Sequence, residues 1–285
     1  MDQSISDPVV MAAQERLLRK REEREAMTSP IPSMPNFEWV ECPPRVQAAT
    51  MAEPCKHGAM EEWCGKCLED NAARRRTERL RTELNNPKKP TLIERIARIN
   101  GVPAKYLESD FMSFAGNDKL VSELDKWSGG SVVLFGNTGC GKTHLAVAMM
   151  KKSISAHIHA EIERNSSQPK SYEPRFKSAP ELLLEIREAF RPGAEESERE
   201  IINRYCTADL LVLDDLGSEK TSEYSIATLY LIIDRRDREL MPTIITTNLS
   251  QKEIEEKLGA RIASRLAGMR NYKINMPDYR KKRGA

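Results

Sequence analysis

The spacing of apolar and polar residues changes along the chain. From about residue 92 onward, short apolar runs alternate with amphipathic stretches, an order typical of a parallel α/β domain. Apolar runs predict strands at residues 132–135, 175–179, 210–213 and 242–248, with a further one from 273. Helical spacing predicts helices at residues 68–84, 119–127, 144–150, 180–190, 197–205, 221–240, 251–258 and 259–266. The predicted fold class is therefore α/β, with a parallel sheet flanked by helices.

The residues ahead of this domain follow a different pattern. Residues 1–36 are polar, rich in Glu and Arg and closed by prolines, so we expect either a solvated tail or one helix that docks a partner. Residues 37–84 have few apolar side chains and end in an arginine-rich helix, which we interpret as a solvated face rather than a nucleic-acid contact. A proline-containing linker is expected at residues 85–100, and the α/β domain then occupies residues 101–285.

Composition narrows the class of protein. The 285 residues carry a net charge of only +2, so any contact with nucleic acid must come from local patches. The chain contains no apolar run near the ~18 residues that span a bilayer, and its first residues lack the order of a secretory signal. We therefore expect a cytoplasmic protein with no membrane contact, in which thiols stay reduced and cysteines bind metal more often than they form disulfides.

A cysteine and histidine cluster precedes the basic helix. Cys55 and His57 form a C-x-H pair, and C-x-x-C follows with Cys64 and Cys67. Zn²⁺ binds four nitrogen or sulfur ligands in a tetrahedron, and a metal would stabilise a segment too polar to fold alone. We predict a structural zinc site at these four residues. Cys42 is a spare candidate, and four unrelated residues or a redox C-x-x-C are the weaker alternatives.

A glycine-rich motif, GNTGCGKT, joins the strand predicted at 132–135 to the following helix. In this pattern backbone N–H groups surround a phosphate chain, the lysine reaches the β- and γ-phosphates, and the hydroxyl binds Mg²⁺. Lys142 and Thr143 hold those two positions, which favours nucleotide binding over a plain glycine-rich turn. The expected nucleotide-binding residues are Gly136, Asn137, Thr138, Gly139, Cys140, Gly141, Lys142, Thr143 and His144.

Two later strands end in polar residues that suit the same site. The run LLVL is followed by Asp214 and Asp215, and the next strand ends at Asn248. Ligands of open parallel sheets bind at the carboxyl ends of the strands. We expect Asp214 to hold Mg²⁺, Asp215 to orient and deprotonate the attacking water, and Asn248 to contact the γ-phosphate and that water. The alternatives are a capping or solvated acid at Asp215 and an Asx-turn at Asn248.

Two arginines share one face of the last predicted helix. Arg261 and Arg265 are four residues apart. An arginine that does not reach its own phosphate loop can stabilise transition-state charge in the site of a neighbouring subunit. We predict Arg265 as this finger, with Arg261 as the second choice.

The assembled motifs GNTGCGKTHLA, LLVLDDLG, TIITTN and RIASRL resemble the AAA+ ATPases of the DnaC/DnaI helicase-loader family, with IstB-like ATPases as close relatives. The resemblance covers roughly residues 92–283, and the Cys/His cluster is similar to the zinc-binding region of DnaI-type and phage-encoded loaders. It implies an AAA+ P-loop core, here without room for a C-terminal lid domain, and ATP, Mg²⁺ and Zn²⁺ as cofactors. The catalytic residues that it implies are Lys142, Asp215, Asn248 and Arg265.

The resemblance also implies a function. Such a protein binds the hexameric replicative DNA helicase through its N-terminal part and loads it onto single-stranded DNA, self-associating through the ATP site. DNA contacts are expected around residues 181–205. The alternatives are an IstB-type transposition helper that remodels duplex DNA, and an adaptor in which ATP acts as a switch with little hydrolysis.

Overall fold

The computed structural model describes residues 65–88, 90–166, 168–220 and 222–279. Every described residue belongs to the second of the chain's two units, Pro54–Ala285. Within these described ranges, no helix is both long and apolar enough to cross a bilayer.

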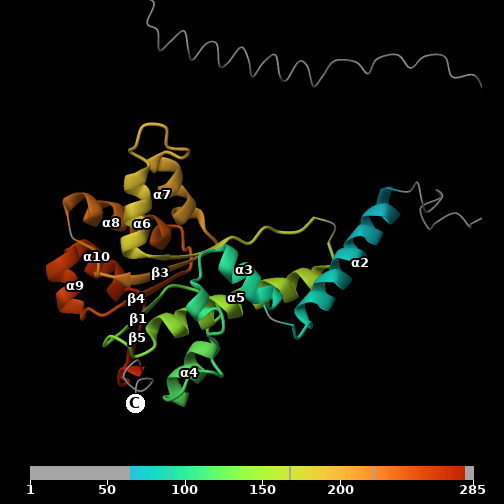
Figure 1. Cartoon of the computed structure of the whole chain (residues 1–285), viewed down its shortest axis with the longest axis horizontal. Helices are drawn as coiled ribbons and strands as arrows, with labels where there is room; N and C mark the ends of the chain where they lie inside the picture. The colour runs from blue at the N-terminus through green and yellow to red at the C-terminus, as the bar shows by residue number, and fades with distance from the viewer. Residues whose placement is uncertain (1–64, 89, 167, 221, 280–285) are drawn as a thin grey trace, which may run out of the picture. The chain divides into compact units, whose positions relative to one another are not determined.

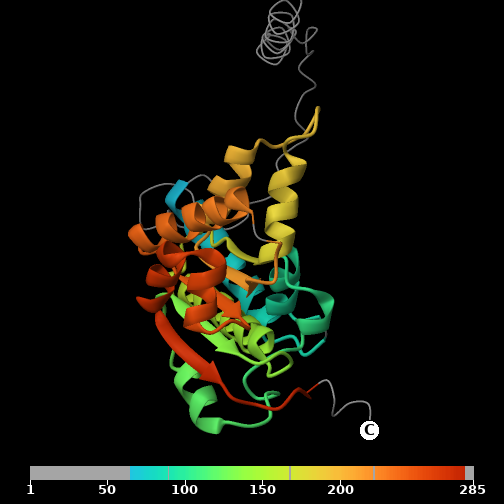
Figure 2. The ribbon, with the colours of Figure 1, turned by 90° about the vertical axis from the view of Figure 1, so that its left-hand side faces the viewer.

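Five parallel strands form the centre of the second unit (Figures 1 and 2). Their order is β2-β3-β4-β1-β5, and each neighbouring pair is parallel. The predicted parallel α/β sheet is confirmed, although the last strand, predicted from residue 273, begins at Arg270. The strands are β1 (Val132–Gly136), β2 (Pro174–Ser178), β3 (Leu210–Leu216), β4 (Thr243–Thr247) and β5 (Arg270–Ile274).

Helices alternate with these strands, as the amphipathic spacing predicted. The long helix after β1 extends well beyond the predicted 144–150, because Ile154, Ile158 and Ile162 are buried at four-residue spacing among polar neighbours. The helices are α2 (Gly65–Leu84), α3 (Leu92–Ile99), the 3₁₀ turn η1 (Ala104–Tyr106), α4 (Asp118–Asp125), α5 (Lys142–Arg164), α6 (Ala179–Glu188), α7 (Glu198–Thr207), α8 (Glu223–Arg238), α9 (Gln251–Leu258) and α10 (Ala260–Ala267).

The helices cover both faces of the sheet (Figure 1). Successive strand residues point to opposite faces, so the central strands β1, β3 and β4 each contribute to two apolar layers. Val133, Leu211 and Ile245 pack with helices α6 to α10. Val132, Leu210 and Ile244 pack with α3, α4 and α5 on the other face. The result is a three-layer α/β/α arrangement with a buried sheet, the setting expected for purely parallel strands.

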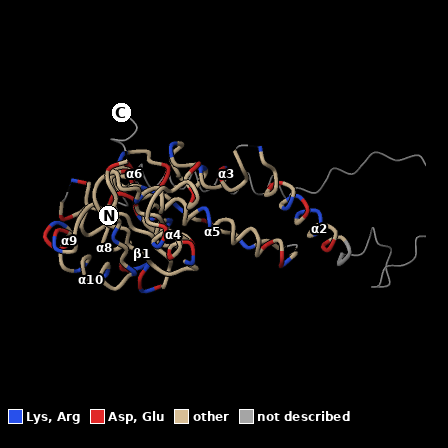
Figure 3. The backbone as a smooth tube through the Cα atoms, turned by 90° about the horizontal axis from the view of Figure 1, so that it is seen from below, with Lys and Arg blue, Asp and Glu red and all other residues tan. Residues whose placement is uncertain are grey.

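Helices α2 and α3 pack against α5. Arg76 Nη1 on α2 lies 3.3 Å from Glu161 Oε2 near the end of α5, and Thr77 Oγ1 donates a hydrogen bond of 2.8 Å to Asn165 Oδ1. Residues 92–99, inside the expected linker, form α3, whose first turn is capped by Thr91. Both basic and acidic residues lie along α2 (Figure 3).

Candidate functional site

A cleft of about 650 Å³ lies where β1, β3 and β4 end at the same edge of the sheet. Residues 138–144 of the glycine-rich loop, Asp214 and Asp215 at the end of β3, and Asn248 after β4 all line it. Three segments that are far apart in the sequence therefore meet in one cavity. Its volume lies in the usual range for small-molecule sites in proteins.

Lys142 is the positive centre of the cleft. It is the first residue of α5, and its side chain is only 5% exposed. The ammonium group donates hydrogen bonds to the carbonyl oxygens of Gly136 at 3.0 Å and Asn137 at 2.9 Å. A third bond, of 2.6 Å, goes to Oδ1 of Asn248. The lysine is thus held at the glycine-rich loop, and its contact with Asn248 links β1 to β4.

A second group of polar contacts joins the loop to β3. The hydroxyl of Thr143 lies 2.9 and 3.1 Å from the two carboxylate oxygens of Asp214. Thr246 on β4 donates a hydrogen bond of 2.6 Å to the same carboxylate. Burial raises the pKa of Asp214, the two hydroxyl hydrogen bonds lower it, and the nearby charge of Asp215 raises it further. A hydroxyl and a buried carboxylate side by side make an oxygen donor set that suits a divalent cation.

Asp215 adopts a backbone conformation that is uncommon outside glycine, with φ of 55°. The strand pairing of β3 with β4 is irregular between Leu213 and Leu216, and Asp215 within this interval lines the cleft. Its N–H donates a hydrogen bond of 2.8 Å to Thr246 Oγ1, and Asn248 Nδ2 lies 3.4 Å from its carboxylate. A strained residue held by its neighbours at the rim of a cleft is the kind of arrangement that functional sites display.

Sequence reasoning missed part of this site. Thr246 on β4 is fully buried and bridges the two acids, two residues before Asn248. The alternation of side chains along a strand was the sequence signal that could have pointed to Thr246. Met276 and Tyr279, which follow β5, also line the cleft and were missed. Tyr106 and Phe114, from the segment before β1, add an aromatic wall.

His144 links the glycine-rich loop to this wall. Its Nε2 lies 2.8 Å from the carbonyl oxygen of Asp110 and 3.3 Å from the hydroxyl of Ser113. Its ring also lies 5.5 Å from the ring of Phe114, measured between centroids. These contacts fix the segment before α4 against the start of α5.

The structure places the two predicted finger arginines outside the cleft of their own chain. Arg265 on α10 binds Asp234 of α8 through Nη2 at 2.7 Å and Nε at 3.0 Å, and its Nη1 lies 3.3 Å from Asp237. Arg261 is exposed, and its guanidinium lies 5.9 Å from the centroid of the Tyr230 ring. Within the described part of the chain, Arg265 is paired with acids and Arg261 is not.

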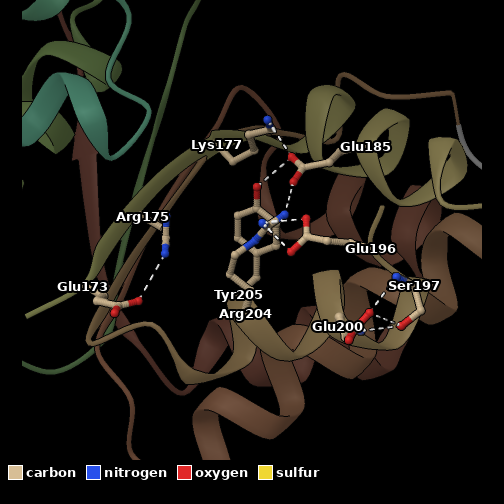
Figure 4. A network of polar contacts seen from close by, with 9 residues as sticks. All are labelled: Glu173, Arg175, Lys177, Glu185, Glu196, Ser197, Glu200, Arg204 and Tyr205. Carbon is tan, nitrogen blue, oxygen red and sulfur yellow. Dashed lines mark hydrogen bonds and ion pairs between the residues drawn. The ribbon is translucent and has the colours of Figure 1, made fainter. Parts of the chain in front are cut away.

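The region expected to contact DNA contains a network of paired charges (Figure 4). Glu185 on α6 accepts hydrogen bonds from Arg204 and Tyr205 on α7 and pairs with Lys177 on β2 at 2.6 Å. Arg204 also binds Glu196 at 2.8 and 2.9 Å. These cations are neutralised within the chain, so the network itself identifies no nucleic-acid contact, and the DNA contact stays a prediction.

The predicted zinc ligands Cys55, His57 and Cys64 lie outside the described residues. Cys67 falls in the first turn of α2, whose side chains at this end are not described. Among the residues that are described, no group of three or more His, Cys, Asp or Glu side chains is placed to hold a metal ion. The zinc site stays a prediction.

The parallel sheet with flanking helices and the glycine-rich loop at its edge define an AAA+ P-loop-like fold. The model of the family described as "IstB-like ATP binding protein" matches residues 56–267, and the chain belongs to this family. The resemblance to DnaC-type AAA+ proteins drawn from the sequence is confirmed, and membership implies ATP binding.

Curated relatives carry names from the same group. The chain is similar to the "Replicative helicase loader DnaC" of Escherichia coli (strain K12), with 27% identity over 136 residues, 48% of this chain and 49% of the relative. It is similar to the protein of that name from Buchnera aphidicola subsp. Baizongia pistaciae, with 24% identity over 202 residues, 67% of this chain and 76% of the relative. The chain thus spans about half the length of the Escherichia coli relative.

Solved structures show partial similarity. One is titled "Crystal structure of the DnaC helicase loader", with 23% identity, a TM-score of 0.49 and coverage of 61% of this chain and 100% of that one. Another, "Crystal Structure of the DnaI", has 21% identity, a TM-score of 0.47 and coverage of 62% and 94%.

Proposed function

We propose that this protein is an ATPase that loads the hexameric replicative DNA helicase onto single-stranded DNA. The observation that carries the proposal is the convergence of Lys142, the Thr143–Asp214 pair and Asp215 with Asn248 in one cleft. The family and the names of the curated relatives supply the biological context.

The residues in the cleft fit ATP and Mg²⁺ by their chemistry. Lys142 would bind the β- and γ-phosphates, and its present partners are neutral oxygen atoms that a phosphate oxygen can replace. Thr143 and Asp214 would hold Mg²⁺, which when bound neutralises charge developing on the transferred phosphoryl group. Asp215 would accept the proton of the attacking water, and Asn248 would position that water next to the γ-phosphate.

The partners are proposed from the family and the relatives. The N-terminal part, with a zinc site at Cys55, His57, Cys64 and Cys67, would bind the helicase. Single-stranded DNA would be contacted around residues 181–205. Self-association through the ATP site would bring Arg265, or alternatively Arg261, to the phosphates of a neighbouring copy.

A pull-down with purified hexameric replicative helicase tests the proposed partner. Loss of helicase binding on zinc chelation tests the proposed metal site.

A duplex-DNA function is the second candidate, because the matching family model is named for IstB-like proteins. ATP turnover with single-stranded and with duplex DNA separates the two candidates. Stimulation by single-stranded DNA supports the loader, stimulation by duplex DNA alone supports the transposition helper, and turnover near zero under both conditions supports an ATP-switch adaptor.

The Lys142→Ala variant tests the phosphate site. The change removes the ammonium at the centre of the cleft, so ATP affinity is expected to fall at least about 100-fold, or about 2.7 kcal/mol, while the fold is retained. Lys152→Ala is the matched control, since Lys152 lies on the same helix and pairs with exposed Asp125 at 3.0 Å. Calorimetric titration with a non-hydrolysable ATP analogue measures both variants. Equal affinity in Lys142→Ala and the wild type would refute the phosphate-loop assignment.

A further inference from the structure

The segment after β5, residues 276–279, lies along the candidate nucleotide cleft, and we name it the strap. Met276, Pro277 and Tyr279 line the cleft together with the glycine-rich loop. The strap is fixed to that loop by the main chain, because the N–H of Tyr279 donates a hydrogen bond of 3.0 Å to the carbonyl oxygen of Gly139. The strap therefore forms part of the lining of the site.

Two glycines show how closely the strap is packed. A Cβ atom at Gly139 would overlap the carboxylate of Asp278, and one at Gly116 would overlap the terminal methyl of Met276. Both glycines also have positive φ, +77° and +103°, which other residues seldom adopt. The strap thus touches the phosphate loop at one end and the segment before α4 at the other.

The side chains of the cleft are divided by chemistry. Lys142, Asp214 and Asp215 supply charges at the strand ends. Tyr106 and Phe114, from the segment before β1, and Met276 and Tyr279, from the strap, supply aromatic and thioether surface. Phe114 also packs tightly over Gly141 of the phosphate loop, so this apolar surface adjoins the triphosphate position. A nucleotide has the same division, with a charged phosphate chain and a flat, largely apolar base.

We propose that the strap is the base-binding wall of the nucleotide site, with the Tyr279 ring stacking on the base opposite Phe114 and Tyr106. The inference rests on the proposed ATP site. Tyr279 is 49% exposed, so its ring has room to pack against a ligand, while its backbone is already held at Gly139. Base–aromatic stacking is tolerant of base identity, so Tyr279 contributes affinity for the base rather than selectivity for adenine.

Two ligands separate contacts to the base from contacts to the phosphates. Tyr279→Ala is expected to weaken binding of a non-hydrolysable ATP analogue about tenfold, equivalent to about 1.4 kcal/mol, in calorimetric titration. Binding of inorganic tripolyphosphate, which has no base, is expected to be the same in Tyr279→Ala and the wild type. Tyr279→Phe keeps the ring and is expected to bind the ATP analogue as the wild type does.

Tyr224→Ala is the matched control, because Tyr224 is a similarly exposed tyrosine, 40% accessible, on α8 and outside the cleft lining. It is expected to leave both affinities unchanged. Unchanged or tighter binding of the ATP analogue by Tyr279→Ala would overturn the inference, as would an equal loss for the analogue and for tripolyphosphate. If the wild type bound tripolyphosphate as tightly as the ATP analogue, the base-binding role of the strap would be refuted, while the phosphate site would stand. Failure of the wild type to bind either ligand would refute the ATP site itself.

Discussion

Asp214 and Asp215 are adjacent in the sequence and occupy different environments. Asp214 is 8% exposed and accepts hydrogen bonds from Thr246 and Thr143. Asp215 turns into the cleft, where Asn248 is its side-chain neighbour. Burial outweighs the hydrogen bonds to Asp214 and raises the pKa of that carboxyl. The ionised form of Asp214 is therefore costly in the absence of a cation, and a divalent metal would offset this cost.

The raised pKa of Asp214 leads to a prediction about pH and stability. The native state binds this proton more tightly than the unfolded state does, so the contribution of Asp214 to stability is fully present below the unfolded pKa of 3.8 and is lost as pH rises through the folded pKa. Asp214→Asn removes that loss and keeps an oxygen acceptor for both threonines. At pH 7 without divalent cations, its Tm is expected to exceed that of the wild type slightly, with the difference shrinking toward pH 4.

Thermal melts from pH 4 to pH 8 measure this effect. Asp125→Asn is the control, and no such gain is expected from it because the Asp125 carboxylate is exposed and pairs with Lys152 at 3.0 Å. Added Mg²⁺ with a non-hydrolysable ATP analogue should stabilise the wild type and not Asp214→Asn. A lower Tm for Asp214→Asn across the whole pH range would contradict the prediction.

At the scale of elements, one buried arginine joins a helix end to two strand starts. Arg236 on α8 is 1% exposed and donates hydrogen bonds to the carbonyl oxygens of Tyr205, Ala208 and Pro242 and to the hydroxyl of Thr243. Burial lowers its pKa to about 10, so the guanidinium remains charged at neutral pH. This one side chain thus binds carbonyl oxygens at the end of α7 and just before β3 and β4.

Arg236→Lys is expected to destabilise the fold. Lysine keeps the charge but lacks the planar array of five N–H donors, so buried carbonyls are left unpaired, at about 1–3 kcal/mol for each. We expect a loss of at least about 2 kcal/mol in the free energy of unfolding, measured by urea denaturation. Arg238→Lys, two residues later and 63% exposed, is the control and should change little. Equal stability of the two variants would show that the carbonyls find other donors.

The sequence predicted the elements better than the contacts between them. The strand runs of β1 to β4 and the helix periods from residue 92 onward are confirmed because these elements bury a face, and burial leaves a periodic pattern. The mostly exposed β5 leaves a weaker pattern, and it begins at Arg270 rather than at the predicted residue 273. The run containing Arg236 reads as a solvated, charged helix end, since nothing local distinguishes a buried arginine from an exposed one. The phosphate loop, Asp214 and Asn248 were found from motifs, whereas Tyr279 was not, because its place depends on a tertiary contact with Gly139.

At the scale of the whole molecule, helix α10 carries an arginine that its own cleft does not use. Arg265 is bound to Asp234 and Asp237 of α8. Those acids hold the side chain beside α8, so it would have to exchange partners to reach a phosphate of another subunit. Arg261, exposed on the same helix, needs no such exchange. Arg265 would therefore have to leave its acidic partners to act as a finger in an assembled oligomer, whereas Arg261 would not.

Mixing inactive variants tests an arginine finger that acts between subunits. Arg265→Ala should spare ATP binding and lower turnover by about 10³-fold, the lower end of the usual finger contribution. A mixture of Arg265→Ala with Asp215→Ala should recover part of the activity, because some interfaces then combine an intact carboxylate with an intact arginine. Steady-state phosphate release measures this recovery.

A mixture of Arg261→Ala with Asp215→Ala serves as the comparison. If ATPase activity recovered in the Arg261→Ala mixture while Arg265→Ala alone kept full activity, Arg261 would be the arginine finger. If neither mixture recovered activity, a role between subunits would be ruled out for both arginines.

The length of α5 has a consequence for how this chain tolerates change over evolution. The helix begins at Lys142 in the phosphate loop and holds Arg76 of α2 through Glu161 near its other end, a span of about 30 Å at 1.5 Å per residue. One inserted residue within α5 would rotate Glu161 by about 100° about the helix axis relative to Lys142. Substitutions on its exposed face leave this spacing intact, whereas insertions and deletions break it. The number of residues between Lys142 and Glu161 is therefore expected to vary far less than their identity.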